Sequence, residues 1–160
     1  MHLYLVQHGD AVAKDMDPLR PLSDKGRKGV GQLASFLARS RFRVDRVLHS
    51  GKLRAQQTAL IYADVLGPGR LVQDCAYPIG PNDAISPLTG ALKSEFGSDD
   101  RVMIVGHLPY MGKLVSQLIT GDETSGCVQF EPGCVIALER GEEMPTWTIQ
   151  WVMRPSLFGG

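Results

Sequence analysis

The chain has 160 residues, of which 43% are hydrophobic and 21% charged, a balance typical of one globular domain, here residues 1–160. Its 17 Lys and Arg residues offset its 17 Asp and Glu residues, so net charge gives no attraction to nucleic acid or to a membrane, and neither partner is expected. The sequence contains no signal-peptide pattern, no apolar run that could span a bilayer, and three cysteines without metal-binding spacing, which predicts a cytoplasmic protein with free thiols.

The first half of the chain alternates short apolar runs with helical patterns. Residues 3–6 predict a buried strand that stops at a polar turn. A loop over residues 17–22 follows, since each of its prolines disfavours helix at the residue before it. Ser23 can cap the next helix, whose apolar side chains recur at helical spacing. Residues 46–49 then predict a second strand, and residues 53–66 a second helix.

The second half continues this alternation. A loop rich in Pro and Gly over residues 77–81 precedes a third helix, and Pro87 is expected to confine the firm part of that helix to its C-terminal side. Residues 102–105 form the clearest buried strand of the sequence. A fourth helix follows and is expected to close near Gly121.

Residues 134–138 and 147–152 predict two late strands, joined by a charged turn and paired antiparallel. Trp147 and Trp151 alternate in phase along the second of these strands, so both are expected on one face. Together the elements predict an α/β fold: a three-layer single domain with a mainly parallel central sheet flanked by helices, and antiparallel only at its late strands.

Two histidines directly follow predicted strands. His8 comes after residues 3–6 and His107 after residues 102–105, each next to a glycine. Ligands of open α/β sheets bind beyond the carboxyl ends of the strands, and parallel neighbours would bring both imidazoles to one rim. A single histidine of this kind is more often structural, whereas two at equivalent strand ends favour a functional site.

A third feature lies where the second predicted strand meets the second predicted helix. Ser50 and Arg54 fall on this turn, where the backbone N–H groups of a helix start favour an anion. Arg54 adds a forked cationic donor that suits phosphate. Because cations are more stable at the C-terminus of a helix, an arginine at this positive end indicates an anionic ligand.

These residues resemble the motifs of a known family. Leu-Val-Gln-His-Gly-Asp at positions 5–10, Arg-Pro-Leu-Ser at 20–23, Ser-x-x-x-Arg-Ala-x-Gln-Thr at 50–58 and Val-Gly-His at 105–107 occur in the order typical of the histidine phosphatase superfamily. The short length and the early Arg-Pro-Leu-Ser segment are most similar to its phosphohistidine phosphatase branch, the SixA type. The resemblance extends from Met1 to about Leu118.

The resemblance implies a phosphatase that needs no cofactor. His8 would be the nucleophile that becomes phosphorylated, and Arg54 and His107 would bind the phosphoryl oxygens. The other residues assigned to substrate binding are Gln7, Gly9, Arg20 and Ser50. The implied partner is a histidine-phosphorylated protein, either a phosphotransfer domain or a phosphocarrier, and the oligomeric state stays open.

The chemistry of these roles sets two further expectations. Attack on phosphorus requires an unprotonated imidazole nitrogen, so the other ring nitrogen of His8 needs an acceptor, for which a backbone carbonyl is expected. Phosphoryl transfer depends mainly on positioning and charge neutralisation, which Arg54, Arg20 and a protonated His107 can supply. No H-x-H or H-x-x-x-H spacing surrounds the histidines, so no metal is expected.

Gln7 is the main departure from the family pattern, which usually has Arg directly before the nucleophile. A Gln amide donates a hydrogen bond but carries no charge and no fork. Losing one oxyanion donor costs about 10²–10³ in rate at acyl-transfer sites. Arg20 can compensate for this loss. The alternative is a catalytically weak member that binds phosphorylated proteins with little turnover.

The sequence also departs from the family pattern in its candidates for the general acid. Asp83 and Asp10 are candidates, although the dipole of a helix start explains Asp83, and support of the turn beside the nucleophile explains Asp10. A pocket without a strong acid suits cleavage of a P–N bond, because imidazole leaves far more readily than an alkoxide. A small-molecule phosphomonoesterase on the same scaffold is the remaining alternative.

Overall fold

The computed structural model describes residues 1–40, 42–67, 71–141 and 146–158. Its strands are β1 His2–Gln7, β2 Arg46–His49, β3 Leu71–Asp74, β4 Arg101–Gly106, β5 Val135–Arg140 and β6 Trp147–Met153. Its helices are α1 Asp24–Arg39, α2 Leu53–Leu66, α3 Ser86–Ser94, α4 Tyr110–Thr120 and the short 3-10 helix Pro155–Phe158. The charged turn expected between the last two strands lies largely outside the described residues.

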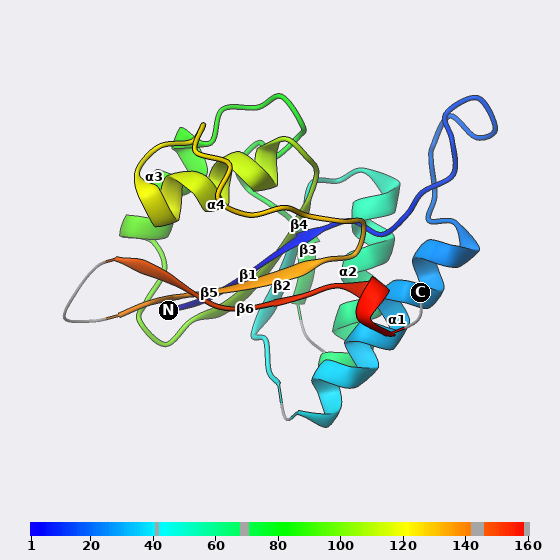
Figure 1. Ribbon diagram of the computed structural model, residues 1–160, viewed down its shortest axis with the longest axis horizontal. Helices are drawn as coiled ribbons and strands as arrows, with labels where there is room; N and C mark the ends of the chain where they lie inside the picture. The colour runs from blue at the N-terminus through cyan, green and yellow to red at the C-terminus, as the bar shows by residue number, and fades with distance from the viewer. Residues whose placement is uncertain (41, 68–70, 142–145, 159–160) are drawn as a thin grey trace.

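The strands form one sheet in the order β3-β2-β4-β1-β5-β6 (Figure 1). The first four in this order run parallel, whereas β5 pairs antiparallel with β1 and β6 pairs antiparallel with β5. The predicted mainly parallel sheet with antiparallel late strands is therefore confirmed. The sequence does not predict β3, because this short edge strand is largely exposed and carries no buried apolar run.

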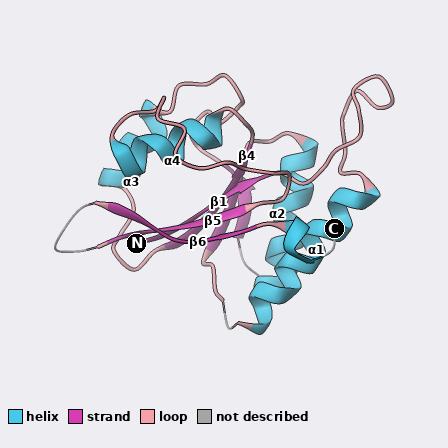
Figure 2. Cartoon of the chain, in the orientation of Figure 1, coloured by secondary structure: helices cyan, strands magenta, loops and turns pink. Residues whose placement is uncertain are grey.

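Helices cover both faces of the sheet and bury two apolar cores (Figure 2). Alternation along β1 supplies both cores: Leu3 and Leu5 pack with α3 and α4, whereas Tyr4 and Val6 pack with α1 and α2. Both faces of the central strands are thus buried, which explains their continuous apolar runs. None of the described helices is both long and apolar enough to cross a bilayer.

The prediction that Trp147 and Trp151 share a face is wrong. Trp147 packs into the core beneath α3 and α4, whereas Trp151 packs on the other face, stacked against Tyr4 with ring centroids 6.0 Å apart. The pairing of β5 with β6 shifts register between Ala137 and Leu138. An extra residue at such a bulge inverts the alternation of faces, and the sequence period carries no sign of it.

The helix termini follow local sequence signals, with one correction. The Ser23 side chain accepts a hydrogen bond from the Gly26 N–H at the start of α1, as its capping role predicts. Gly121 ends α4 in the left-handed conformation, with φ 78°. Pro87 does not confine α3 to a C-terminal part, because it lies in the first turn, where a proline removes no helical hydrogen bond.

Gly26 lies where α1 packs closely against the turn after β1, so a side chain at this position is expected to destabilise the fold. An added Cβ at Gly26 would overlap the backbone of Asp10, 2.8 Å from its nitrogen, whereas a Cβ at Gly31 meets no atom within 4 Å. We predict that Gly26→Ala lowers the free energy of unfolding by about 1–3 kcal/mol. Urea denaturation measures this change.

The matched control is Gly31→Ala in the same helix. Alanine has the higher helix propensity and meets open space here, so the free energy of unfolding should rise by about 0.5–1 kcal/mol. Equal effects of the two substitutions would contradict the packing argument.

Candidate active site

A pocket lies beyond the carboxyl ends of β1 and β4, where the sequence predicts a site. Its volume is about 350 Å³, and its lining residues are Gln7, His8, Asp10, Ala11, Arg20, Arg54, Pro81, His107, Leu108 and Pro132. A larger cavity of about 1040 Å³ between α3, α4 and β6 has no histidine, cysteine or carboxylate among its described lining residues, so it offers no comparable chemistry.

The parallel pairing of β1 with β4 brings the two strand-end histidines together. Gln7 lies opposite Gly106 in this register, and the His8 N–H donates to the Gly106 carbonyl at 3.0 Å. The next residue on each strand is a histidine, and the His8 and His107 ring centroids are 4.9 Å apart. The structure thus places both imidazoles at one rim, as the equivalent strand ends predict.

Hydrogen bonds fix the protonation of the His8 ring. Its Nδ1 lies 2.7 Å from the Gly9 carbonyl oxygen, which can only accept, so Nδ1 carries the proton. Its Nε2 then accepts from Arg54 Nε at 3.1 Å. Burial lowers the pKa of His8 below its usual value, and the charges of Arg54 and Arg20 lower it further against the opposing effect of Gly9. A neutral His8 therefore presents an unprotonated nitrogen near neutral pH.

Thr58 ties Arg54 to the turn that carries His8. The buried Thr58 hydroxyl donates to the Arg54 carbonyl at 2.8 Å, one helical turn earlier, and accepts from the Gly9 N–H at 3.1 Å. The sequence identifies Thr58 only as the last residue of the motif at positions 50–58, with no role assigned to it. Its spacing of four residues from Arg54 is the signal that could have identified it.

Ser50 contacts the second histidine. Its hydroxyl lies 2.5 Å from His107 Nε2, and the turn that holds Ser50 is fixed by the buried side chain of His49. The Nδ1 atom of His49 accepts from the Gly51 N–H at 3.1 Å and also lies 3.1 Å from a carboxylate oxygen of Asp74 on β3. His49 thus supports the turn and is not among the residues that line the pocket.

The predicted protonation of His107 is not what the structure supports. Burial lowers its pKa to about 3, with additional contributions from the nearby His8, Arg54, Lys52 and Arg20. The sequence could not give this result, since it depends on how many cations the fold gathers at one rim. His107 is therefore neutral near pH 7 until an anion offsets this positive surrounding.

Arg20 and Gln7 also reach the pocket. Arg20 lies on the loop after β1 in the left-handed backbone region, with φ 50°, and its Nε donates to the Val12 carbonyl at 3.1 Å. This leaves the terminal guanidinium nitrogens of Arg20 for a ligand. The Gln7 Oε1 atom is buried and has no hydrogen-bond partner within the described part of the chain.

Asp10 lines the pocket and Gly9 precedes it in the chain, but both residues already make hydrogen bonds within the protein. The Gly9 N–H and carbonyl hold Thr58 and His8, so Gly9 positions the nucleophile. The Asp10 carboxylate accepts from the Ser23 hydroxyl at 2.6 Å, and its carbonyl accepts from the Ser23 N–H at 3.0 Å. These contacts match the expectation that Asp10 supports the turn.

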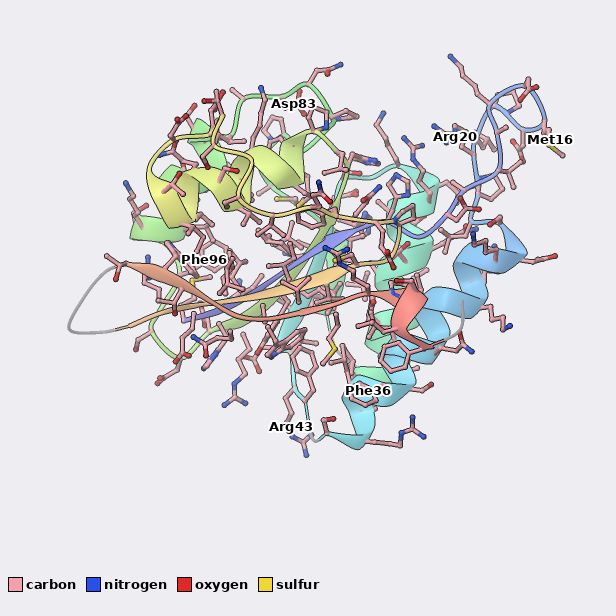
Figure 3. All side chains as sticks on the ribbon, viewed as in Figure 1. Met16, Arg20, Phe36, Arg43, Asp83 and Phe96 are labelled. Atoms are coloured by element: carbon pink, nitrogen blue, oxygen red, sulfur yellow. The ribbon has the colours of Figure 1, made fainter. Side chains whose placement is uncertain are left out.

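Asp83 is not among the pocket-lining residues, although Pro81 on the same loop is. Asp83 lies three residues before α3 begins, and its carboxylate accepts a hydrogen bond from the Gly80 N–H at 2.6 Å. Figure 3 shows Asp83 and Arg20 on separate loops. Asp83 thus stabilises its own loop, where the sequence suggested a helix-start residue. Among the described residues, no three His, Cys, Asp or Glu side chains gather as a metal site would need.

The lowered pKa of His107 predicts a pH-dependent stability. Below about pH 6.5 the unfolded chain protonates this imidazole, whereas the folded protein does so only near pH 3. Unfolding therefore takes up a proton between these values, and the free energy of unfolding falls as pH decreases. We expect His107→Gln to lose less stability than the wild type between pH 6.5 and pH 4, as measured by urea denaturation at several pH values.

Parallel stability curves for the two proteins would contradict this assignment. His8 and His49, whose pKa values are also lowered by burial, are present in both proteins, so the difference between the curves isolates His107.

Comparison with known proteins agrees with this geometry. Residues 3–75 match the family model of the histidine phosphatase superfamily (branch 1). The chain is 28% identical to phosphohistidine phosphatase SixA of Escherichia coli over 158 residues, which cover 97% of this chain and 94% of that protein. It is 31% identical to an uncharacterized protein of Picosynechococcus sp. over 147 residues, which cover 88% and 86% of the two chains.

A solved structure of the protein histidine phosphatase SixA complexed with tungstate matches the whole fold. The TM-score is 0.84 at 25% identity, and the match covers 99% of each chain. This chain belongs to the histidine phosphatase superfamily and is a phosphatase, as its motifs predict.

Proposed function

We propose that this phosphatase removes the phosphoryl group from a histidine-phosphorylated protein through a phospho-His8 intermediate. The observation that carries the proposal is the state of His8: its Nδ1 proton is held by the Gly9 carbonyl, so the Nε2 lone pair faces Arg54 and His107 in the pocket. The similarity to phosphohistidine phosphatase SixA supports the choice of a P–N substrate.

In the first step, the Nε2 lone pair of His8 forms a bond to phosphorus. Arg54 Nε donates to that lone pair, so attack requires Arg54 to transfer this hydrogen bond to a phosphoryl oxygen. The bond from phosphorus to the substrate imidazole breaks, and the electron pair leaves with that imidazole. A proton on the other ring nitrogen of the substrate histidine makes the leaving group a neutral imidazole. Arg54 and Arg20 neutralise the phosphoryl charge, because phosphoryl transfer depends mainly on positioning and electrostatics.

In the second step, water attacks phosphorus and the bond to His8 breaks. Phosphate is released, and the electron pair returns to His8 Nε2. The Gly9 carbonyl holds the Nδ1 proton throughout both steps, so the ring does not rotate or change tautomer. Ser50 contacts the Nε2 atom of His107, and the Nδ1 atom of His107 is buried without a hydrogen-bond partner among the described residues. Contact of His107 with a phosphoryl oxygen therefore requires Nε2 to exchange the Ser50 hydroxyl for that oxygen.

The pocket lacks a free general acid among the residues described. Asp10 is the one carboxylate in its described lining, and its oxygen is bonded to Ser23. An alkoxide leaving group needs a proton from the enzyme, whereas imidazole leaves without strong assistance. This chemistry favours a phosphohistidine over an alkyl phosphate, and it disfavours the alternative of a small-molecule phosphomonoesterase.

The decisive experiment follows phosphate release from a histidine-phosphorylated phosphocarrier protein and from an alkyl phosphate. We expect the wild type to prefer the phosphoprotein. We expect His8→Ala to lose at least about a thousandfold in rate, the order seen when an enzyme loses its nucleophile. When the phosphoryl group of the phosphoprotein is labelled, the label should become bound to the wild-type chain and not to His8→Ala.

His2→Ala is the matched control, because His2 lies at the opposite end of the same strand. It should keep the activity of the wild type. A preference for the alkyl phosphate would contradict the P–N assignment. Binding of the phosphoprotein without release by the wild type would favour the alternative of a binding protein, which the neutral Gln7 motivates.

A second prediction concerns Gln7 itself. Gln7→Arg adds a charged, forked donor at the pocket, so we expect kcat to rise by less than about tenfold for the phosphoprotein and by more for the alkyl phosphate, whose poor leaving group depends more on charge stabilisation. The added charge should also lower the pKa of His8 further and move the acid limb of kcat/KM to lower pH.

Gln7→Met isolates the amide, since it has similar size but no donor. We expect it to lower kcat. If Gln7→Arg leaves both the rate and the pH profile unchanged, position 7 does not face the phosphoryl group.

A further inference from the structure

Part of the pocket lining is apolar. Ala11, Pro81, Leu108 and Pro132 share the pocket lining with the polar groups assigned to the phosphoryl group. These four residues, the apolar collar, have no side-chain donor or acceptor. A sugar phosphate or other small polar metabolite would find no hydrogen-bond partner for its hydroxyl groups there. This part of the lining therefore favours apolar contact with the remainder of the substrate.

Two exposed apolar side chains lie on the loop after β1, residues 11–22, which also contributes Ala11 to the pocket lining. Met16 and Leu19 lie on this loop with exposed fractions of 79% and 70%, higher than any other large hydrophobic residue described. The same loop supplies Arg20 to the pocket. Figure 1 shows the loop projecting from the body of the molecule, and Figure 3 shows Met16 at its outer end.

Hydrogen bonds order this loop, although the side chains of Met16 and Leu19 remain exposed to solvent. Ala11 and Leu22 form a bridge at its base, where the Gln57 side chain also accepts from the Leu22 N–H at 2.7 Å. Further bonds within the loop join Val12 to Pro21, Met16 and Asp17 to Ala13, and Leu19 and Arg20 to Asp17. Fixing a chain costs conformational entropy, and no burial of Met16 or Leu19 in this molecule offsets that cost.

We infer that the apolar collar, together with Met16 and Leu19, is a docking surface for a protein that carries its phosphohistidine within an apolar patch. This inference rests on the proposed function and specifies how its substrate is recognised. The cationic pocket holds the phosphoryl group, and the surrounding surface buries apolar area of the partner. Large exposed apolar side chains beside a functional site are typical of protein interfaces.

The test compares two substrates that share the same P–N bond. One is a histidine-phosphorylated phosphocarrier protein, and the other is free phosphohistidine. The double variant Met16→Gln, Leu19→Gln should lower kcat/KM for the phosphoprotein about tenfold. It should leave kcat/KM for free phosphohistidine within about twofold, because the phosphoryl ligands are unchanged. Activity on free phosphohistidine also shows that the variant is folded.

Leu157→Gln is the matched control, since Leu157 is 67% exposed but lies outside the pocket lining, on the 3-10 helix near the C-terminus. It should affect neither substrate. Equal effects of the double variant on both substrates, or no effect on either, would overturn the docking surface while leaving the proposed function intact. Failure of the wild type to hydrolyse either substrate would remove the proposed function and this inference with it.

Discussion

The hydrogen bond from His8 Nδ1 to the Gly9 carbonyl is the constraint on which the rest of the site depends. Without it the ring could place its proton on either nitrogen, and a proton on Nε2 would remove the lone pair that faces the pocket. The carbonyl can hold this position only because Thr58 binds the N–H of the same residue from α2. One buried hydroxyl thus sets both the turn and, through the Arg54 carbonyl, the helix start opposite it.

Close packing of the backbone makes this arrangement rigid. A Cβ on Gly9 would lie 2.8 Å from a methyl group of Val30, and α1 approaches the next residue, Asp10, just as closely at Gly26. The turn after β1 therefore has no room to shift between the two helices that cover its face of the sheet. Rigid support of this kind keeps catalytic groups in place, so little reorganisation is needed when charge develops at phosphorus.

Sequence patterns predict the central strands, the flanking helices and the meeting of His8 with His107, because burial on both faces leaves a clear apolar signal in β1 and β4. Features that depend on tertiary context are missed. The bulge that separates Trp147 from Trp151 leaves the sequence period unchanged. The charge state of His107 depends first on its burial and then on charged groups that the fold gathers from separate segments of the chain. The position of residues in the chain predicts which of them meet at the site. It does not predict how their charges and burial shift the pKa of each histidine.

The charges already present around the pocket explain why a neutral residue is tolerated at position 7. Burial, Arg54 and Arg20 already lower the pKa of His8, so the ring is neutral at pH 7 and a third cation beside it would not make more of the reactive form available. Its gain would come only from stabilising charge on the phosphoryl oxygens, which is worth most when the leaving group is poor. A phosphohistidine departs as imidazole and makes the smallest demand for such help. The neutral residue at position 7 and the carboxylate of Asp10, held by Ser23, therefore have one explanation: both are tolerable in a pocket whose substrate is already activated for P–N cleavage.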